Sequence, residues 1–150
     1  GSEALHKFRG MFAFAIWDTR KKELFFDPKN LVQQHAALKL LTDSLSTIKE
    51  KAKTLKKILS DVIQSHGQTG IEQGESEIGG GSLATESLPT YLVFLTIDQY
   101  GENELSQKLR CQNPAIITRI HDKRVVFDLR TVREDEIEII KHAVSQIIQN

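Results

Sequence analysis

The chain has 150 residues, with 20 Lys or Arg, 20 Asp or Glu, and a formal net charge of zero. Hydrophobic residues make up 39% and charged residues 27%, which is ordinary for a globular domain, and about 150 residues can bury a core without disulfide or metal staples. The zero net charge argues against an electrostatic nucleic-acid binder and excludes an acidic disordered tail. It conceals an asymmetry, because residues 1–75 hold 12 basic and 9 acidic residues, and residues 76–150 hold 8 and 11.

The single cysteine, Cys111, excludes an internal disulfide and a cysteine-based zinc site and fits a reducing cytosol. No apolar run reaches the roughly 18 residues of a membrane span, and no signal peptide precedes the first strand. We therefore expect a cytoplasmic protein without membrane contacts. The chain begins Gly1-Ser2, and its only methionine is Met11. This start is typical of tag removal, so we interpret residues 1–2 as a cloning scar and the chain as a piece of a longer protein.

The first half of the chain predicts a β-hairpin followed by helices. Apolar residues 11–17 and the stretch 23–26 flank the polar turn 18–22, as in a hairpin. Residues 29–66 predict a short helix, Leu31 to Leu41, and a long helix with Ser44 as its N-cap and Gly67 just past its end. The long helix repeats apolar residues every three or four positions. We expect the other face to be solvated; it carries Lys49, Glu50, Lys51, Lys53, Lys56 and Lys57.

The second half predicts an antiparallel sheet with two further helices. Residues 71–78 indicate a weak strand, 91–97 a central strand, 101–111 a short helix, and 115–120 with 124–129 a second hairpin. A last helix opens at Thr131 or Val132, with acidic residues in its first turn. Its predicted inward positions are Ile137, Ile140, Ala143 or Val144, and Ile147. The order ββ-α-β-β-α-β-β-α predicts an α+β fold, in which a mostly antiparallel sheet carries helices on one face and the N-terminal hairpin is added to the sheet.

Two candidate binding features stand out. The loop Gly79, Gly80, Gly81 and Ser82 could approach a phosphate, but it lacks the P-loop and dinucleotide-binding patterns, so a flexible connection is the simpler interpretation. Arg119, Arg130 and Arg124 lie on the second hairpin or beside it. Arginines on rigid strands can bind carboxylate or phosphate, although solvated strand faces also carry them routinely.

Catalytic and metal-binding patterns are missing from the sequence. The five histidines show no metal-ligand spacing, and no H-E-x-x-H motif occurs. Ser82 and Cys111 have no evident base in the sequence, so a nucleophilic enzyme is not expected. We predict no catalytic residue, no cofactor-binding residue and no metal ligand.

Several stretches of residues 27–150 resemble one enzyme family. The motifs are Gly74–Leu83, Leu88–Tyr91, Leu105–Arg110, Asn113–Ile120 and Phe127–Val132, with Leu38–Thr42 before the long helix. They resemble bacterial selenocysteine synthase, the L-seryl-tRNA(Sec) selenium transferase. The resemblance implies a fold-type-I, pyridoxal-phosphate-dependent enzyme that converts seryl-tRNA(Sec) to selenocysteinyl-tRNA(Sec) with selenophosphate.

The resemblance implies that residues 27–150 are the C-terminal small domain of that family. The large domain, with the lysine that holds pyridoxal phosphate, and the tRNA-binding region have no counterpart in the chain. Arg119 and Arg130 are then the candidates for facing the cleft of the whole enzyme. No cofactor is expected in this chain itself.

Residues 3–26 resemble a second family. Leu5–Asp18 and Lys22–Phe26 look like a core hairpin of the glutaminase domain of asparagine synthetase, a class II glutamine amidotransferase. The N-terminal cysteine nucleophile of that family is absent, and no glutaminase activity is implied.

Two fragments joined near Phe26 and Asp27 suggest an engineered chimera. The leading hypothesis is one folded, non-catalytic structural module in which a borrowed hairpin covers an exposed sheet edge. The alternative is an isolated enzyme module that still binds an anion or tRNA weakly through Arg119, Arg124 and Arg130. Self-association through sheet edges is a further expectation, and tRNA is expected as a partner of the full-length parent alone.

Overall fold

The computed structural model describes residues 16–18, 23–25, 40, 42–77 and 87–149. The chain divides into two units, Gly1–Thr42 and Asp43–Asn150, and each is described by itself. The first unit contains β1 (Ile16–Asp18) and β2 (Glu23–Phe25), which pair antiparallel as the sequence predicts. The predicted helix Leu31 to Leu41 lies almost wholly outside the described residues.

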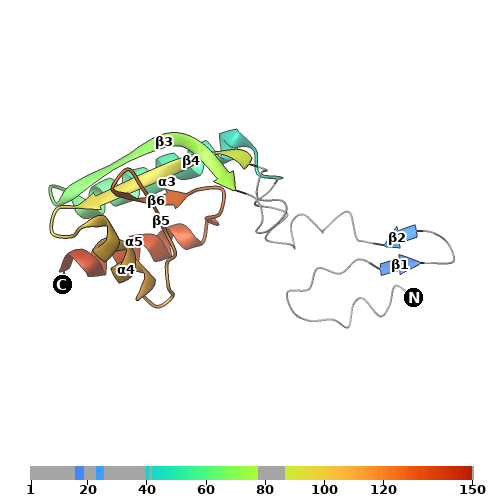
Figure 1. The fold of residues 1–150 in the computed structure, drawn as a ribbon. Coiled ribbons are helices and arrows are strands. Elements are labelled where there is room, and N and C mark those ends of the chain that lie inside the picture. Colours follow the sequence, from blue (N-terminus) through green and yellow to red (C-terminus); the bar gives the residue numbers. More distant parts are fainter. Residues whose placement is uncertain (1–15, 19–22, 26–39, 41, 78–86, 150) are drawn as a thin grey trace. The chain divides into compact units, whose positions relative to one another are not determined.

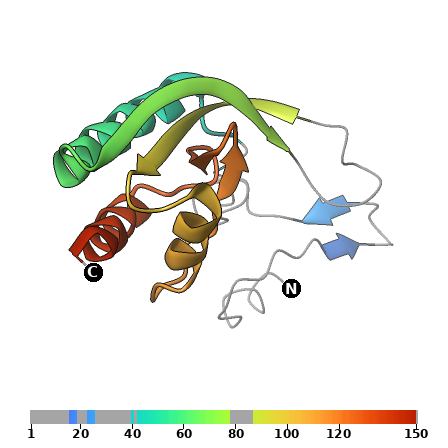
Figure 2. The same cartoon turned by 60° about the vertical axis from the view of Figure 1, so that its left-hand side comes forward.

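The second unit is an α+β fold, as predicted. Its elements are α3 (Leu45–Ile63), β3 (Gly67–Glu77), β4 (Ser87–Ile97), α4 (Glu102–Arg110), β5 (Arg119–His121), β6 (Arg124–Asp128) and α5 (Glu136–Gln149). The four strands form an antiparallel sheet in the order β3-β4-β6-β5. Figure 1 shows the two long strands, β3 and β4, running side by side along α3, and Figure 2 shows their curvature.

The hairpin β1-β2 forms a two-stranded sheet, in which the two strands exchange backbone hydrogen bonds with each other. The expectation that this hairpin is added to the larger sheet stays a prediction. The four-stranded sheet has β3 and β5 as its edges.

One face of the four-stranded sheet carries the core. Alternate residues of a strand point to the same face, and Val93, Leu95 and Val125 are fully buried in one cluster with side chains from all three helices. The helical members of this cluster are Ile48, Ala52, Leu55, Leu59 and Ile63 of α3, Leu105 and Leu109 of α4, and Ile137, Ile140, Ala143, Val144 and Ile147 of α5. The inward positions predicted for the last helix are thus confirmed. Every helix in the described part of the chain is too short or too polar to span a bilayer.

The structure confirms the predicted cap of α3 and corrects several other element ends, among them the strand predicted at 115–120, in place of which β5 spans Arg119–His121. Ser44 caps α3 as predicted, since its Oγ accepts a hydrogen bond from Thr47 N at 3.1 Å. Gly67 does not follow the helix end; Gln64 takes that place, and Gly67 opens β3, where a Cβ would lie 2.0 Å from the Thr96 carbonyl oxygen. The weak strand 71–78 is the longer β3, because its whole length pairs with β4.

The last helix begins at Glu136 rather than at Thr131 or Val132. Its start is fixed by side chains, since the Glu136 carboxylate accepts from Arg133 N at 2.8 Å and the Thr131 hydroxyl donates to the Asp128 carbonyl at 2.9 Å. The pKa of Arg133 is raised, chiefly by its hydrogen bond to Asp135.

Candidate functional site

The sheet face that lies away from the helices is crossed by arginines. Arg124 of β6 lies 4.3 Å from the centre of the Phe94 ring on β4 and donates to Glu72 of β3 at 3.1 Å. Phe94 in turn lies over Gly70, where a Cβ would come within 2.5 Å of the ring. A cation held over an aromatic face is attracted by the ring quadrupole. Arg124 therefore spans three strands and is paired within the fold.

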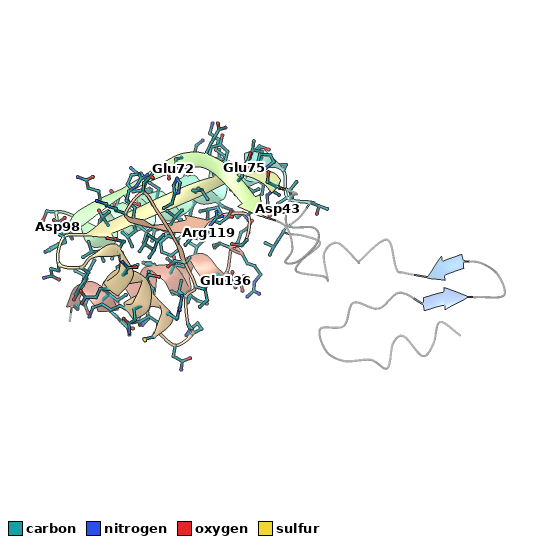
Figure 3. All side chains as sticks on the ribbon, viewed as in Figure 1. Asp43, Glu72, Glu75, Asp98, Arg119 and Glu136 are labelled. Carbon is teal, nitrogen blue, oxygen red and sulfur yellow. The ribbon has the colours of Figure 1, made fainter. Side chains whose placement is uncertain are left out.

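Arg119 crosses the same face nearer the end of the sheet. It donates to Asp128 Oδ2 at 3.0 Å and to the Glu75 carbonyl at 3.3 Å, so it links β5 to β6 and β3. Its side chain is 45% exposed, whereas the Asp128 side chain is 9% exposed. Figure 3 labels Glu75 and Asp43 at the end of the sheet opposite Asp98.

Asp128 is the centre of these contacts. Besides Arg119, its carboxylate accepts from Ser76 Oγ at 2.6 Å, Thr90 Oγ1 at 2.7 Å and the Arg130 backbone N at 3.1 Å. The hydrogen bonds therefore come from four different residues and converge on one carboxylate. We call Ser76, Thr90, Arg119, Asp128 and Arg130 the Asp128 cluster. It joins all four strand regions at one end of the sheet.

Arg130 is buried, with 6% of its surface exposed. Its guanidinium donates to the Pro89 carbonyl at 2.6 Å and to the Asp43 carbonyl at 3.2 Å. The Asp43 carboxylate also accepts from Lys51 Nζ at 3.1 Å, and Lys51 Nζ donates to the Val132 carbonyl at 3.0 Å. The buried cations therefore fix the start of the second unit to the ends of β4 and β6.

Lys51 corrects the sequence prediction of a solvated position. It is 6% exposed, and it lies three residues after Ile48 and four before Leu55, which is the spacing of the buried face. The periodicity could have revealed this position. Its acceptors, Asp43 and the Val132 carbonyl, come from outside the helix and could not be inferred from helical spacing.

The structure brings Arg119 and Arg130 together through Asp128. It places Arg124 at the opposite end of β6 from Asp128, with separate partners. Sequence reasoning missed Asp128, Ser76 and Thr90. The signal that could have pointed to Asp128 is its place in the sequence, directly after the apolar run of β6 and before Leu129 and Arg130. The loop Gly79–Ser82 lies outside the described residues, although β3 and β4, which flank it, pair through Glu77 and Ser87.

The surface beside the Asp128 cluster is a shallow hollow of about 350 Å³. Its lining includes Glu72, Glu75, Leu92, Arg119, His121 and Val126. Two carboxylates line it together with the Arg119 guanidinium, which is shared between Asp128 and the Glu75 carbonyl. The hollow therefore presents no concentrated positive charge for an anion.

The buried Lys51 and the hollow beside it do not fit a pyridoxal phosphate site. Such a site needs a lysine that is free to form a Schiff base, and the buried Lys51 is held by Asp43 and the Val132 carbonyl. The hollow of about 560 Å³ beside it is lined by Glu50, Glu134 and Glu138, which would repel a phosphate. Likewise, no group of three His, Cys, Asp or Glu side chains in the described ranges could hold a metal ion.

The fold and its polar cluster define a small α+β module with an internally paired set of arginines. The family model of L-seryl-tRNA selenium transferase (SelA) matches residues 14–133. The chain belongs to this family.

Similar proteins include L-seryl-tRNA(Sec) selenium transferases from Alkaliphilus oremlandii (34% identical over 131 residues, 85% of this chain and 27% of that protein) and Clostridium perfringens (36% over 123 residues, 82% and 26%). The protein of Aquifex aeolicus is 30% identical over 126 residues, or 84% of this chain and 27% of that protein. The chain thus spans about a quarter of the length of these relatives. The family match begins at residue 14, before the junction expected near Phe26 and Asp27.

We predict that Asp128→Asn lowers the free energy of unfolding by about 2–4 kcal/mol, because it removes the charge that the cluster encloses. Urea unfolding would measure the change. Asp122→Asn is the matched control, since that carboxylate is 71% exposed, and exposed ion pairs contribute less than about 1 kcal/mol. Equal stability of the two variants would contradict the central position of Asp128.

Proposed function

We propose that residues 27–150 are the C-terminal small domain of a selenocysteine synthase and act as a non-catalytic structural module of a longer enzyme. The chain covers 27% of its relative from Alkaliphilus oremlandii, so most of such an enzyme would lie elsewhere. Its contribution to converting seryl-tRNA(Sec) to selenocysteinyl-tRNA(Sec) would be to complete the fold of that enzyme. Pyridoxal phosphate would supply the electron sink for the parent reaction when bound there.

The observation that carries this proposal is that the candidate arginines are paired with acceptors of the chain itself. Arg130 is buried and donates to backbone carbonyls, Arg119 is paired with Asp128, and Arg124 is paired with Glu72. An arginine that recognises a ligand needs donors available to the ligand. These contacts favour a structural role over the alternative of anion or tRNA binding through the strand arginines.

We predict that the chain alone forms no internal aldimine and transfers no selenium. Pyridoxal phosphate would be titrated with absorbance detection, and selenocysteinyl-tRNA(Sec) formation would be assayed with selenophosphate and seryl-tRNA(Sec). The full-length Aquifex aeolicus relative serves as the positive control. An aldimine band that disappears on borohydride reduction, or turnover by the chain alone, would overturn the non-catalytic assignment.

A second proposal concerns residues 3–26. We propose that they derive from an amidotransferase-like hairpin, and that this hairpin was joined to the selenocysteine-synthase module to make an engineered chimera. The motif Leu5–Asp18 and the antiparallel pairing of β1 with β2 support it. Within the four-stranded sheet, β3 and β5 each have one edge without a strand partner among the described residues. An added hairpin would protect such an edge from self-association.

Deleting residues 3–26 is expected to lower the free energy of unfolding and to increase self-association, because an edge is left uncovered. Light scattering after size exclusion would measure the molar mass, and urea unfolding the stability. Deleting residues 3–13 is the control, because it retains both strands of the hairpin. A shortened chain that is equally stable, monomeric and soluble would refute the covering role.

A further inference from the structure

Strand β3 is an edge of the sheet that lacks the usual means of blocking an edge. In the described residues its outer side has no strand partner. It is 11 residues long and contains neither proline nor lysine, and its pairing with β4 runs without a bulge from Gly67 opposite Ile97 to Glu77 opposite Ser87. The other edge strand, β5, is three residues long and carries Arg119. Since short length, proline, lysine and bulges protect natural edges, β3 is the more open of the two.

The pairing of β4 identifies the backbone groups of β3 that point outward. The carbonyl of Tyr91 on β4 accepts a hydrogen bond from Leu129 N, just after β6, so the backbone of Tyr91 turns away from β3. Gln73 lies directly opposite Tyr91, and opposite residues of an antiparallel pair either bond to each other or both turn away. The N–H and C=O groups of Gln73, and by alternation those of Ile71 and Thr69, therefore point outward. We call Thr69, Ile71 and Gln73 the open edge of β3.

One side of α3 lies along this edge. Figure 1 and Figure 2 both show β3 and α3 side by side, and the chain turns directly from the end of α3 into β3, so the two run antiparallel. The opposite side of α3 faces α5, because Lys51 and Ile58 line one hollow together with Ile137 of α5. Lys49 and Lys56 each precede one of these two residues by two positions, which is about 200° around the helix. They therefore lie on the β3 side of α3.

Three lysines of α3 accompany the open edge. Lys49 Nζ lies 5.6 Å from the centre of the Tyr91 ring, and the Tyr91 hydroxyl accepts from Gln73 Nε2 at 3.1 Å. Lys53 and Lys56 follow about one and two helical turns later. From Lys49 to Lys56 the helix rises about 10 Å, a length that about three residues of a strand span. We call Lys49, Lys53 and Lys56 the lysine row of α3.

The lysine row is weakly neutralised. Lys53 forms an exposed pair with Glu50 at 2.7 Å, and Lys56 makes no ion pair in the part of the chain that the structure describes. Residues 67–71 of β3 contain no charged side chain. Glu72, the next residue, points to the other face of the sheet, where it pairs with an arginine of β6 at 3.1 Å. On the helix side, this part of the edge is therefore positively charged.

We propose that the open edge of β3 binds an acidic, extended segment of another protein, which adds to the sheet as a further strand. In strand addition, main-chain hydrogen bonds supply the affinity and alternate side chains supply the specificity. Residues of the added strand that bond to Thr69, Ile71 and Gln73 turn their side chains to the same face as these three. That face is the helix side, because Ile71 packs against the core.

Acidic residues at those alternate positions of the added strand, about 7 Å apart, would meet the lysine row. Both the hydrogen-bonding edge and the adjacent charge thus select one kind of partner. The inference does not rest on the proposed function, and it leaves the β5 edge for the covering role proposed for residues 3–26.

The test measures the affinity of the full chain, by fluorescence anisotropy, for a fluorescein-labelled eight-residue peptide that alternates glutamate with threonine. Two further peptides carry backbone N-methyl groups, on the glutamates in one and on the threonines in the other. In the proposed pairing the glutamate amides face β3 and the threonine amides face solvent. N-methylation of the glutamates is expected to weaken binding at least about tenfold, because donors to β3 are lost. N-methylation of the threonines is expected to change the affinity less than about threefold.

The charge contribution is tested on the chain. Lys53→Gln together with Lys56→Gln is expected to weaken binding about five- to twentyfold, because an exposed ion pair contributes up to about fivefold. The matched control, Lys123→Gln with Lys141→Gln, removes the same charge from the β5-β6 turn and α5 and is expected to stay within about twofold. Lys53→Arg with Lys56→Arg is expected to retain binding, since the charge is kept.

Amide hydrogen exchange locates the contact. With the peptide bound, the amides of Thr69, Ile71 and Gln73 are expected to exchange at least about tenfold more slowly, while those of β5 stay unchanged.

Four results would overturn the proposal: no binding of the peptide by the unchanged chain, equal affinities for the two N-methylated peptides, equal losses in the lysine-row and control variants, or full protection of the three amides before peptide is added. The second would reduce the contact to charge attraction without strand pairing. The fourth would show that the edge is already covered by the chain itself or by a second copy.

Discussion

The carboxylate of Asp128, whose side chain is 9% exposed, is the constraint on which one end of the sheet depends. It sits at the last position of β6, and hydroxyl, guanidinium and backbone donors from β3, β4, β5 and the following turn converge on it. A buried charge is costly unless such donors surround it. The position of Arg119 and the path of the chain into Arg130 follow from satisfying that one group.

Arg130 extends this constraint to the start of the second unit. It connects the carbonyl of Pro89 with that of Asp43, and Asp43 in turn holds the buried Lys51. Strand β4 and Asp43, which lies shortly before α3, are thereby joined through the buried cation of Arg130. The aligned residues cover 27% of the relative from Alkaliphilus oremlandii, and we propose that in such a longer enzyme this network holds a small domain in shape.

The order of elements, the cap at Ser44 and the inward faces of α3 and α5 could be predicted from the sequence, because local periodicity and capping chemistry determine them. The partners of Lys51 and Asp128 could not be predicted, because they lie outside the elements that carry these two residues and are brought close by the fold. The start of α5 was placed too early, because side-chain bonds of Thr131 and Glu136 hold the preceding residues in a turn. The candidate arginines stay a prediction as binding residues, and their partners within the fold, Asp128, Glu72 and backbone carbonyls, could not be inferred from the sequence.

The most direct test of this account is a double-mutant cycle between Asp128 and Arg119, measured by urea unfolding of the full chain with Asp128→Asn, Arg119→Gln and both together. The account predicts that the combined loss is smaller than the sum of the single losses, with a coupling of about 1–3 kcal/mol, as for residues in one buried network. Losses that add to within about 0.5 kcal/mol would show that Arg119 is not held by Asp128. The arginine would then be available to a ligand, contrary to the structural role assigned to it.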